Sequence, residues 1–234
     1  MFSYSNIISR CVKNACKNNE RSISFRSISK LFSIYFHRSN KSSKPPYDHI
    51  CQIGDPVLRN KASPVDKKVI ETQEFQKTLE HLHKVMKKYE TVGLAAPQIG
   101  FPWQVFAIEV TEKALEHIPP QMQQFFHMQT HPLTFFINPK LEIINPTEMI
   151  CHEMCGSISC YQAEVPRAKE VQITALNRFG EPFCWKGKDW LARIAQHEMD
   201  HLHGILYVDR MFPLTFEYCH WENINKNDGK VVLD

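Results

Sequence analysis

Two histidines and a glutamate near the end of the chain have the types and spacing of a metal site with its own general base. They lie in QHEMDHLHG, residues 196–204, where His197 and His201 are four residues apart and Glu198 follows the first histidine. Residues i and i+4 of a helix share one face, so both imidazoles can reach one ion and the carboxylate can reach a water beside it. A helix whose histidines merely face solvent is the alternative.

The sequence around this motif favours a buried helix, because several of its neighbours are apolar: Leu191, Ile194, Ala195, Met199 and Leu202. A buried imidazole needs a polar partner, and a metal ion would provide one. A catalytic site of this kind has three protein ligands and one open position. The downstream candidates for a third ligand are weak: His203 on the wrong helical face, Glu217 near the C-terminus, and His220.

Periodic patterns predict the elements that would position the motif. Apolar side chains recur at helical spacing over residues 66–89, which predicts an amphipathic helix. The motif lies on a second helix, which begins near Asp189 and ends at Gly204. Residues 91–100 are expected to form a loop and residues 111–132 a surface insertion. Extended segments are expected at residues 105–110, 135–139, 171–177, 181–187 and 205–211. This pattern predicts an α+β fold, in which antiparallel β-sheets pack around a central helix carrying HExxH.

Charge is divided unevenly along the 234 residues, although the net charge is only +3. Residues 1–44 hold nine basic residues and one acid, which leaves 19 basic and 24 acidic residues in residues 45–234. The acidic balance of the larger region argues against nucleic-acid binding. No apolar run approaches the ~18–20 residues that a bilayer span requires, so no membrane span is expected.

The first 44 residues have the composition of a mitochondrial transit peptide, being basic, Ser-rich and almost free of acids. A disordered basic tail is the alternative. Pro45-Pro46 indicates a linker where order begins, so residues 45–234 are expected to form one catalytic domain. Six of the eight cysteines lie in that domain. In an organellar protein they are expected to be thiols, with any special one serving as a metal ligand.

Three boxes follow one another along the chain: TVGLAAPQIG (91–100), HEMCGSISCYQAEVPR (152–167) and QHEMDHLHG (196–204). With these boxes the chain resembles the peptide deformylases, specifically the animal mitochondrial type, over residues 48–212. The resemblance implies a metal-dependent hydrolase that removes the formyl group from N-terminal formyl-methionine and releases formate. It further implies nascent N-formyl-methionyl peptides as substrates, the mitochondrial matrix as location, and a homodimer.

The resemblance also assigns roles to residues of the second and third boxes. Cys155 would be the third metal ligand beside His197 and His201, which leaves a fourth tetrahedral position for water. Glu198 would take the proton of that water and later pass it to the leaving amine. One divalent ion per chain is implied, with Fe²⁺ preferred and Zn²⁺ or Co²⁺ accepted.

Hydrolysis of a formamide builds negative charge on the formyl oxygen, which needs preset donors. By resemblance, these donors are the Gln98 side-chain amide and the Gly156 backbone N–H. The methionine side chain would enter a mostly apolar pocket, whose substrate-binding residues are Val92, Gly93, Leu94, Glu153 and Arg193. A surface position for Arg193 is an equal alternative. Arg167 is expected to be a structural anchor of the second box.

The second box departs from the family's usual E-G-C-L-S. Met154 stands where the family has glycine, and Gly156 stands where it has leucine. The second change would remove an apolar cover over the metal and loosen the backbone that donates to the oxyanion. The first box begins with Thr91 in place of the usual glycine. All ligands, the base and Gln98 are present, so an active but slow enzyme is expected.

Two other functions compete with this interpretation. A general zinc endopeptidase would share the HExxH motif, but the cysteine at 155 and the weak downstream ligands argue against it. A degenerate deformylase that binds metal as a scaffold without turnover is supported only by Met154 and Gly156. Metal binding without formate release would identify the scaffold.

Overall fold

The computed structural model describes residues 44–116 and 118–229, so the predicted transit peptide lies outside the described residues except for its last position. The helices and 3₁₀ turns (η) are η2 (Pro56–Arg59), α3 (Lys67–Ile70), α4 (Gln73–Lys88), η3 (Ala96–Ile99), α5 (Glu112–Glu116), α6 (Pro120–Phe125), α7 (Asp189–Leu202), η4 (Tyr207–Asp209), η5 (Pro213–Thr215) and α8 (Trp221–Lys226). The strands are β1 (Gly93–Ala95), β2 (Val105–Val110), β3 (His131–Cys155), β4 (Ile158–Leu176), β5 (Pro182–Lys188) and β6 (Glu217–Tyr218).

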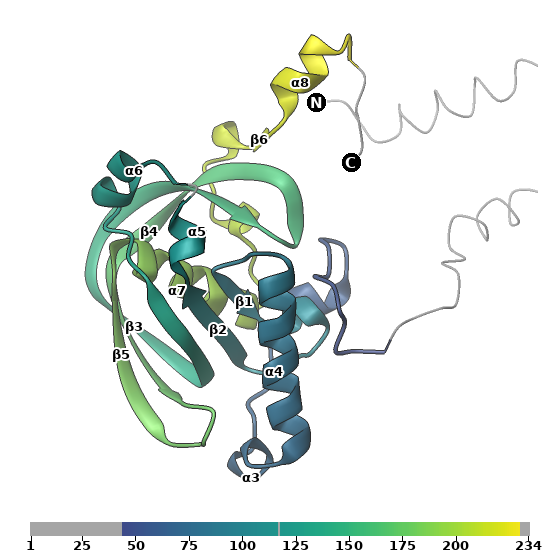
Figure 1. Ribbon diagram of the computed structural model, residues 1–234, viewed down its shortest axis with the longest axis vertical. Helices are drawn as coiled ribbons and strands as arrows, with labels where there is room; N and C mark the ends of the chain where they lie inside the picture. Colours follow the sequence, from purple (N-terminus) through teal and green to yellow (C-terminus); the bar gives the residue numbers. More distant parts are fainter. Residues whose placement is uncertain (1–43, 117, 230–234) are drawn as a thin grey trace, which may run out of the picture. The chain divides into compact units, whose positions relative to one another are not determined.

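The strands of the described residues form one sheet in the order β1-β2-β3-β4-β5, and every pair is antiparallel. β4 has two neighbours on its second edge, because residues 170–176 pair with β5 and residues 161–162 pair with β6. The register between β3 and β4 shifts at several bulges, which bend strands and increase their twist. Figure 1 shows these two long strands curving around α7. The predicted α+β class, with antiparallel strands around the motif helix, is confirmed.

Strand β2 lies between α4 and α7. Its two faces belong to two different clusters of buried residues. Its side chains alternate between faces, as a period of two requires. Phe106 and Ile108 pack with buried residues of α7, whereas Val105 and Ala107 pack with the buried face of α4. All four side chains are nearly inaccessible to solvent. The sheet therefore holds α7 on one face and α4 on the other.

The helix predicted over residues 66–89 is interrupted, so this prediction was wrong in its first turns. Its residues form α3 and α4, which are separated at Thr72. The Thr72 hydroxyl accepts a hydrogen bond from the Phe75 N–H at 3.3 Å and donates one to the Val69 carbonyl at 2.6 Å. A threonine that bonds the backbone in this way caps a new helix and ends the previous one. The buried face of α4 follows the predicted spacing: Phe75, Leu79, Leu82, Val85 and Met86.

The strand expected at residues 205–211 is also wrong. Tyr207–Asp209 form the 3₁₀ turn η4, because the Asp209 carboxylate accepts from the Leu206 N–H at 2.8 Å and pairs with Arg59. Leu206 and Tyr207 are buried against the start of β4. Their apolar character therefore reflects burial in a turn, which a short apolar run cannot distinguish from a strand.

Part of the expected loop at residues 91–100 is regular structure. Gly93–Ala95 pair with β2 as strand β1, with Leu94 opposite Ala107, and residues 96–99 follow as η3. The sequence concealed this strand because a three-residue run rich in glycine and alanine has no alternating pattern. The first box is consequently fixed to the sheet, which places its side chains rigidly.

The other predicted elements lie within or close to elements of the structure, although β3 and β4 extend well beyond the expected segments 135–139 and 171–177. Strand β2 occupies residues 105–110 and α7 starts at Asp189, as expected. The helix ends before Gly204, whose φ of 72° is the left-handed conformation of a C′ glycine. A Cβ on Gly204 would lie 2.5 Å from the Arg59 carbonyl oxygen, so close backbone approach also requires glycine there.

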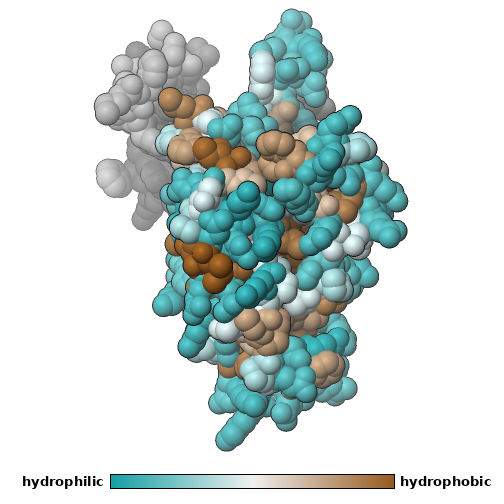
Figure 2. Space-filling view, turned by 90° about the vertical axis from the view of Figure 1, so that its left-hand side faces the viewer, coloured by the Kyte–Doolittle hydropathy of each residue, from teal (hydrophilic) through white to brown (hydrophobic). Residues whose placement is uncertain are grey.

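The predicted surface insertion at residues 111–132 contains the short helices α5 and α6. Phe125 is largely exposed there, as are single apolar side chains elsewhere. On the face shown in Figure 2, hydrophobic side chains form separate patches in a mainly hydrophilic surface. Scattered apolar residues of this kind are normal on protein surfaces. Among the described helices, none is long and apolar enough to cross a bilayer.

Candidate active site

Three potential metal ligands meet where the end of β3 faces α7. The ligand atoms of Cys155, His197 and His201 all lie within 4.8 Å of one another, and the Cys155 Sγ is 3.3 Å from His201 Nε2. The two histidines are one turn apart on α7, as their spacing predicts, while the β3–β4 hairpin delivers the cysteine. A thiolate with two imidazoles suits Zn²⁺, Fe²⁺ or Co²⁺ and leaves a fourth position open. The residues present therefore fit a divalent ion.

Electrostatics favour the ligating form of the cysteine. Burial alone would raise the pKa of the Cys155 thiol, but the two imidazoles hold its pKa well below the usual range. The same interaction, together with the Glu153 carboxylate, raises the pKa of His197 against the effect of burial. The lowered pKa favours the thiolate form of Cys155, which is the form that binds metals.

Glu153 orients one of the imidazoles. Its Oε2 lies 2.9 Å from His197 Nδ1, which leaves Nε2 of that ring to face the ligand cluster. Its two oxygens also accept from the Arg167 guanidinium at 2.8 and 2.9 Å. Burial would raise the pKa of Glu153, but hydrogen bonds from Arg167 and His197 lower it well below the usual range. Glu153, which was predicted to bind substrate, therefore already has both carboxylate oxygens bonded to Arg167 and His197.

Arg167 connects this carboxylate to α7. Its guanidinium also donates to Asp200 Oδ2 at 2.6 Å, and Asp200 precedes His201 on the helix. The side chain of Arg167 is only 3% exposed, and those of Glu153 and Asp200 are 3% and 9% exposed. Arg210 completes the cluster from the far side, with two hydrogen bonds to Asp200. The second box and the motif helix are therefore joined by one buried ionic network, which fits the anchor predicted at Arg167.

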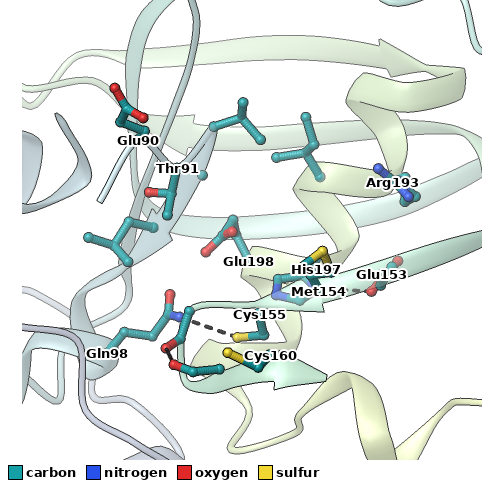
Figure 3. A pocket seen from close by; sticks show the side chains of 16 residues that line it. Glu90, Thr91, Gln98, Glu153, Met154, Cys155, Cys160, Arg193, His197 and Glu198 are labelled. Atoms are coloured by element: carbon teal, nitrogen blue, oxygen red, sulfur yellow. Dashed lines mark hydrogen bonds and ion pairs between the residues drawn. The ribbon is translucent and has the colours of Figure 1, made fainter. Parts of the chain in front are cut away.

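Glu198 is buried beside the ligands with one carboxylate oxygen unused. The residue is 4% exposed, and its Oε2 has no hydrogen-bond partner among the described residues. Burial raises the pKa of Glu198 to about 7, against the lowering effect of His197 and His201. A carboxylate with this pKa can both accept and return a proton near neutral pH. In Figure 3 its side chain lies between Gln98 and His197, above Cys155.

Gly93 provides the space that this carboxylate occupies. A Cβ on Gly93 would lie 2.5 Å from Glu198 Oε1 and 3.0 Å from its Cδ. The two groups come from β1 and α7, so the contact joins the first box to the third.

Gly93→Ala is expected to lower kcat/KM by about 10²-fold, because the added methyl group displaces the base by about 1 Å. The effect should fall mainly on kcat, and bound metal should remain at the native level. Steady-state kinetics and metal analysis measure both quantities. Leu94→Val, at the next position of the strand, alters the proposed methionine pocket and is the comparison: it should act mainly on KM and leave kcat close to native. Native kcat in Gly93→Ala would contradict the steric role.

The amide of Gln98 is held with its NH₂ group toward the cluster. Its Oε1 accepts from the Ala95 N–H at 2.9 Å, which fixes the orientation of the amide. Its Nε2 donates to Ser157 Oγ at 3.2 Å and to Cys155 Sγ at 3.6 Å, the latter drawn in Figure 3. The residue is 3% exposed. A donor preset in this way is suited to a developing oxyanion.

Gly156 is held more firmly than its sequence suggests. Its carbonyl accepts from Gln52 Nε2 at 2.7 Å, and a Cβ at this position would lie 2.8 Å from Ile50 Cδ1. Ile50 is itself buried and lies against the glycine. These contacts hold the backbone at Gly156, and the predicted loss of apolar cover over the metal stays a prediction. Met154, by contrast, is 59% exposed at the rim of the cavity.

A cavity of about 460 Å³ opens beside these groups. Its walls include every predicted substrate-binding residue: Val92, Gly93, Leu94, Glu153 and Arg193. The Arg193 guanidinium donates to the His152 carbonyl at 2.6 Å, so it forms part of the wall. Sequence reasoning assigned no site role to six wall residues: Glu90, Thr91, Met154, Ser159, Cys160 and Ile194. No local pattern marks Glu90, Ser159 and Cys160, because the bulge in β4 and the turn after α4 bring them to the cavity.

Comparisons with known proteins agree with this geometry. The sequence profile of the polypeptide deformylase family matches residues 47–217. The mitochondrial peptide deformylase of Homo sapiens is 41% identical over 78% of this chain and 75% of its own length. The chloroplastic peptide deformylase 1A of Solanum lycopersicum is 36% identical, and the match spans 78% of this chain and 66% of that protein. Among solved structures, a peptide deformylase from Synechococcus elongatus in complex with actinonin is 31% identical over 82% of this chain and 91% of its own, with a TM-score of 0.60.

Proposed function

Since this chain belongs to the polypeptide deformylase family and removes the formyl group from nascent peptides, we propose that Glu198 is the general base of the reaction. The unpartnered Oε2 of this buried carboxylate is the observation that supports the role most directly. Cys155, His197 and His201 would hold the metal ion that the family requires. An ion bound there would act as a Lewis acid toward the formyl oxygen and make water a stronger acid.

Other side chains of the cavity would transfer protons, stabilise the developing negative charge and orient a metal ligand. Glu198 takes the proton of the attacking water and then delivers it to the departing amine, so its charge is restored in each cycle. The Gln98 amide and the Gly156 N–H donate to the oxygen on which negative charge develops. Glu153 keeps the His197 ring oriented throughout, because both its oxygens are held in the buried network.

The substrate would lie along β1. This strand pairs only with β2 among the described strands, so its other edge is available to an extended peptide. Val92 and Leu94 would contact the methionine side chain, while the Arg193 stem closes the wall. α7 contributes Arg193, Ile194, His197 and Glu198 to the walls of the cavity. A general endopeptidase would have to accept the interior of a polypeptide, and Cys155 as the third ligand argues against that function.

The native ion, the location and the assembly are further parts of the proposal. We propose Fe²⁺ as the native ion on the family resemblance, with Zn²⁺ and Co²⁺ as substitutes, because a thiolate and two imidazoles fit all three. Residues 1–44 would direct the protein to the mitochondrial matrix, which the mitochondrial relative in Homo sapiens supports. A homodimer is proposed through the apolar residues 211–216, where Leu214 is 101% exposed. Sedimentation analysis of the purified chain tests the last point.

Formate release from formyl-Met-Ala tests the function together with its metal. The protein is purified without oxygen, treated with a chelator, and reloaded in parallel with Fe²⁺, Co²⁺ or Zn²⁺. Activity should disappear with the metal and return on reloading, most strongly with Fe²⁺. A blocked peptide with methionine in its interior carries no formyl group and should not be cleaved, whereas a general endopeptidase would cut it. Tight metal binding with no formate from any preparation would instead identify a scaffold.

A further inference from the structure

Two neighbouring cysteines, of which one lines the cavity, have no role in the proposed reaction. Cys160 is exposed and lines the cavity, and Cys219 is partly buried just after β6. The pairing of Tyr161 with Tyr218 places the two cysteines next to each other on adjoining segments. The Cys219 N–H donates to the Cys160 carbonyl at 2.8 Å, which continues this pairing by one residue. The cysteines are therefore cross-strand neighbours, although they are distant in sequence.

Their spacing suits a covalent bond. Residues opposite each other in an antiparallel pair have Cα atoms about 4.5–5.5 Å apart, which lies within the ~4.4–6.8 Å that a disulfide spans. The rings of Tyr161 and Tyr218 contact each other with centroids 5.4 Å apart. The Cys160 thiol also contributes, after burial, to the raised pKa of Cys219, as expected for nearby sulfurs.

The backbone at Cys160 sets this residue apart. Between the pairs Met154–Gln162 and Cys155–Ile158, β4 contains additional residues that have no partner on β3. Cys160 lies in this bulge with a φ of 67°, the left-handed conformation that glycine adopts most readily. A cysteine therefore occupies a position that favours glycine, and its neighbour across the strands is another cysteine.

We propose that Cys160 and Cys219 form a reversible disulfide that fastens the C-terminal segment to the wall of the catalytic cavity. The oxidant is a low-molecular-weight disulfide of the glutathione class. The exposed Cys160 thiolate attacks one glutathione sulfur, the S–S bond breaks, and the first glutathione leaves as a thiolate that takes up a proton. Cys219, after losing its proton, attacks the Cys160 sulfur and expels the second glutathione. Two protein thiols are oxidised, and one glutathione disulfide is reduced to two thiols.

Oxidation would strengthen a connection that is otherwise weak. In the reduced protein, the contacts of β6 and its flanking residues with β4 include two residue pairs, the Cys219–Cys160 backbone bond, ring contacts of Tyr161 with Phe216 and Tyr218, and a Gln162–Glu217 hydrogen bond of 2.6 Å. Tyr161 is 38% exposed and Phe216 40%, so few of these contacts are fully buried and local opening is favoured here over the core. A disulfide would hold residues 217–229 beside the cavity rim and couple the redox state of the protein to access to the site.

Peptide mapping of the metal-loaded chain tests the proposal. The protein is incubated with glutathione disulfide, the remaining thiols are alkylated, and trypsin digestion is followed by mass spectrometry without reductant. We expect peptide 141–167 joined to peptide 211–226, with fragmentation placing the link on Cys160 and reductant separating the two. Cys184→Ser removes an exposed cysteine on β5 and is the matched control, in which the link should persist.

Two variants distinguish this disulfide from other thiol chemistry. Cys160→Gly suits the left-handed backbone and should fold, and Cys219→Ser removes the second thiol. Both should lose the cross-link, and Cys219→Ser should accumulate a glutathione adduct on Cys160 in its place. Glutathione remaining on Cys160 of the native protein without a cross-link would overturn the proposal. A link between peptides 141–167 and 211–226 that survives in Cys160→Gly would overturn the proposal as well, because the link would then involve Cys151 or Cys155.

Discussion

Glu198→Gln is expected to reduce kcat/KM for formyl-Met-Ala by about 10²–10⁴-fold, the usual contribution of a positioned general base. Glutamine has nearly the same shape as glutamate and fits the space beside Gly93, so the fold should be unchanged. It cannot accept the proton of the attacking water, and the unpartnered Oε2 of the native carboxylate would be replaced by an amide group. Formate release under steady-state conditions measures the effect, which should appear in kcat.

Metal content and thermal unfolding separate loss of the base from loss of the site. Glu198→Gln should bind one ion per chain and unfold at nearly the native temperature, because Glu198 makes no hydrogen bond through its Oε2. The other buried carboxylate of the site, Glu153, has both oxygens engaged by Arg167 and His197 and cannot substitute as base. A variant with full metal and more than about a tenth of native kcat would show that the base lies elsewhere.

The local part of this site is readable from the sequence. The spacing of His197 and His201 on one helical face predicts their approach, because helical geometry alone fixes it. The short apolar run of residues 105–110 predicts strand β2 to the residue. Cys155 and Gln98 are different, since only the resemblance of three ordered boxes to a known family placed them beside the histidines. Their proximity arises from the β3–β4 hairpin and from η3, which no periodic pattern links to α7.

Long-range partners are the part that the sequence could not supply. Gly156 stands in place of the family's leucine, and its carbonyl accepts from Gln52, about a hundred residues earlier in the chain. Glu153 seemed free to meet the substrate because its partner Arg167 belongs to the opposite strand. Residues 205–211 seemed extended because burial, rather than strand pairing, selected their apolar side chains. In each case a contact with a segment distant in the sequence determines the local structure, and the local sequence pattern does not reveal that contact.

Arg167→Leu is expected to lower the free energy of unfolding by about 3–5 kcal/mol, because it removes one partner from a buried ionic network. Arg167 is 3% exposed and neutralises both Glu153 and Asp200, which are themselves nearly inaccessible. Without it, two carboxylates would remain in a region of low dielectric with only His197 and Arg210 as counter-charges. Urea unfolding of the metal-free protein measures the loss without the added stability that a bound ion provides.

Arg210→Leu is the matched control, because Arg210 also pairs with Asp200 but its side chain is 45% exposed. Solvent screens that pair, so about 1 kcal/mol or less should be lost. The two variants should differ again in metal binding. Arg167→Leu releases Glu153, the residue that orients His197, and should weaken metal affinity by about 10–100-fold, whereas Arg210→Leu should leave it unchanged. Equal stability and equal metal affinity in the two variants would mean that the network neither supports the fold nor positions the ligand. A difference in both would mean that Arg167 has two roles: its ion pair with Asp200 stabilises the packing of α7 against β4, and its ion pair with Glu153 sets the orientation of the His197 ligand.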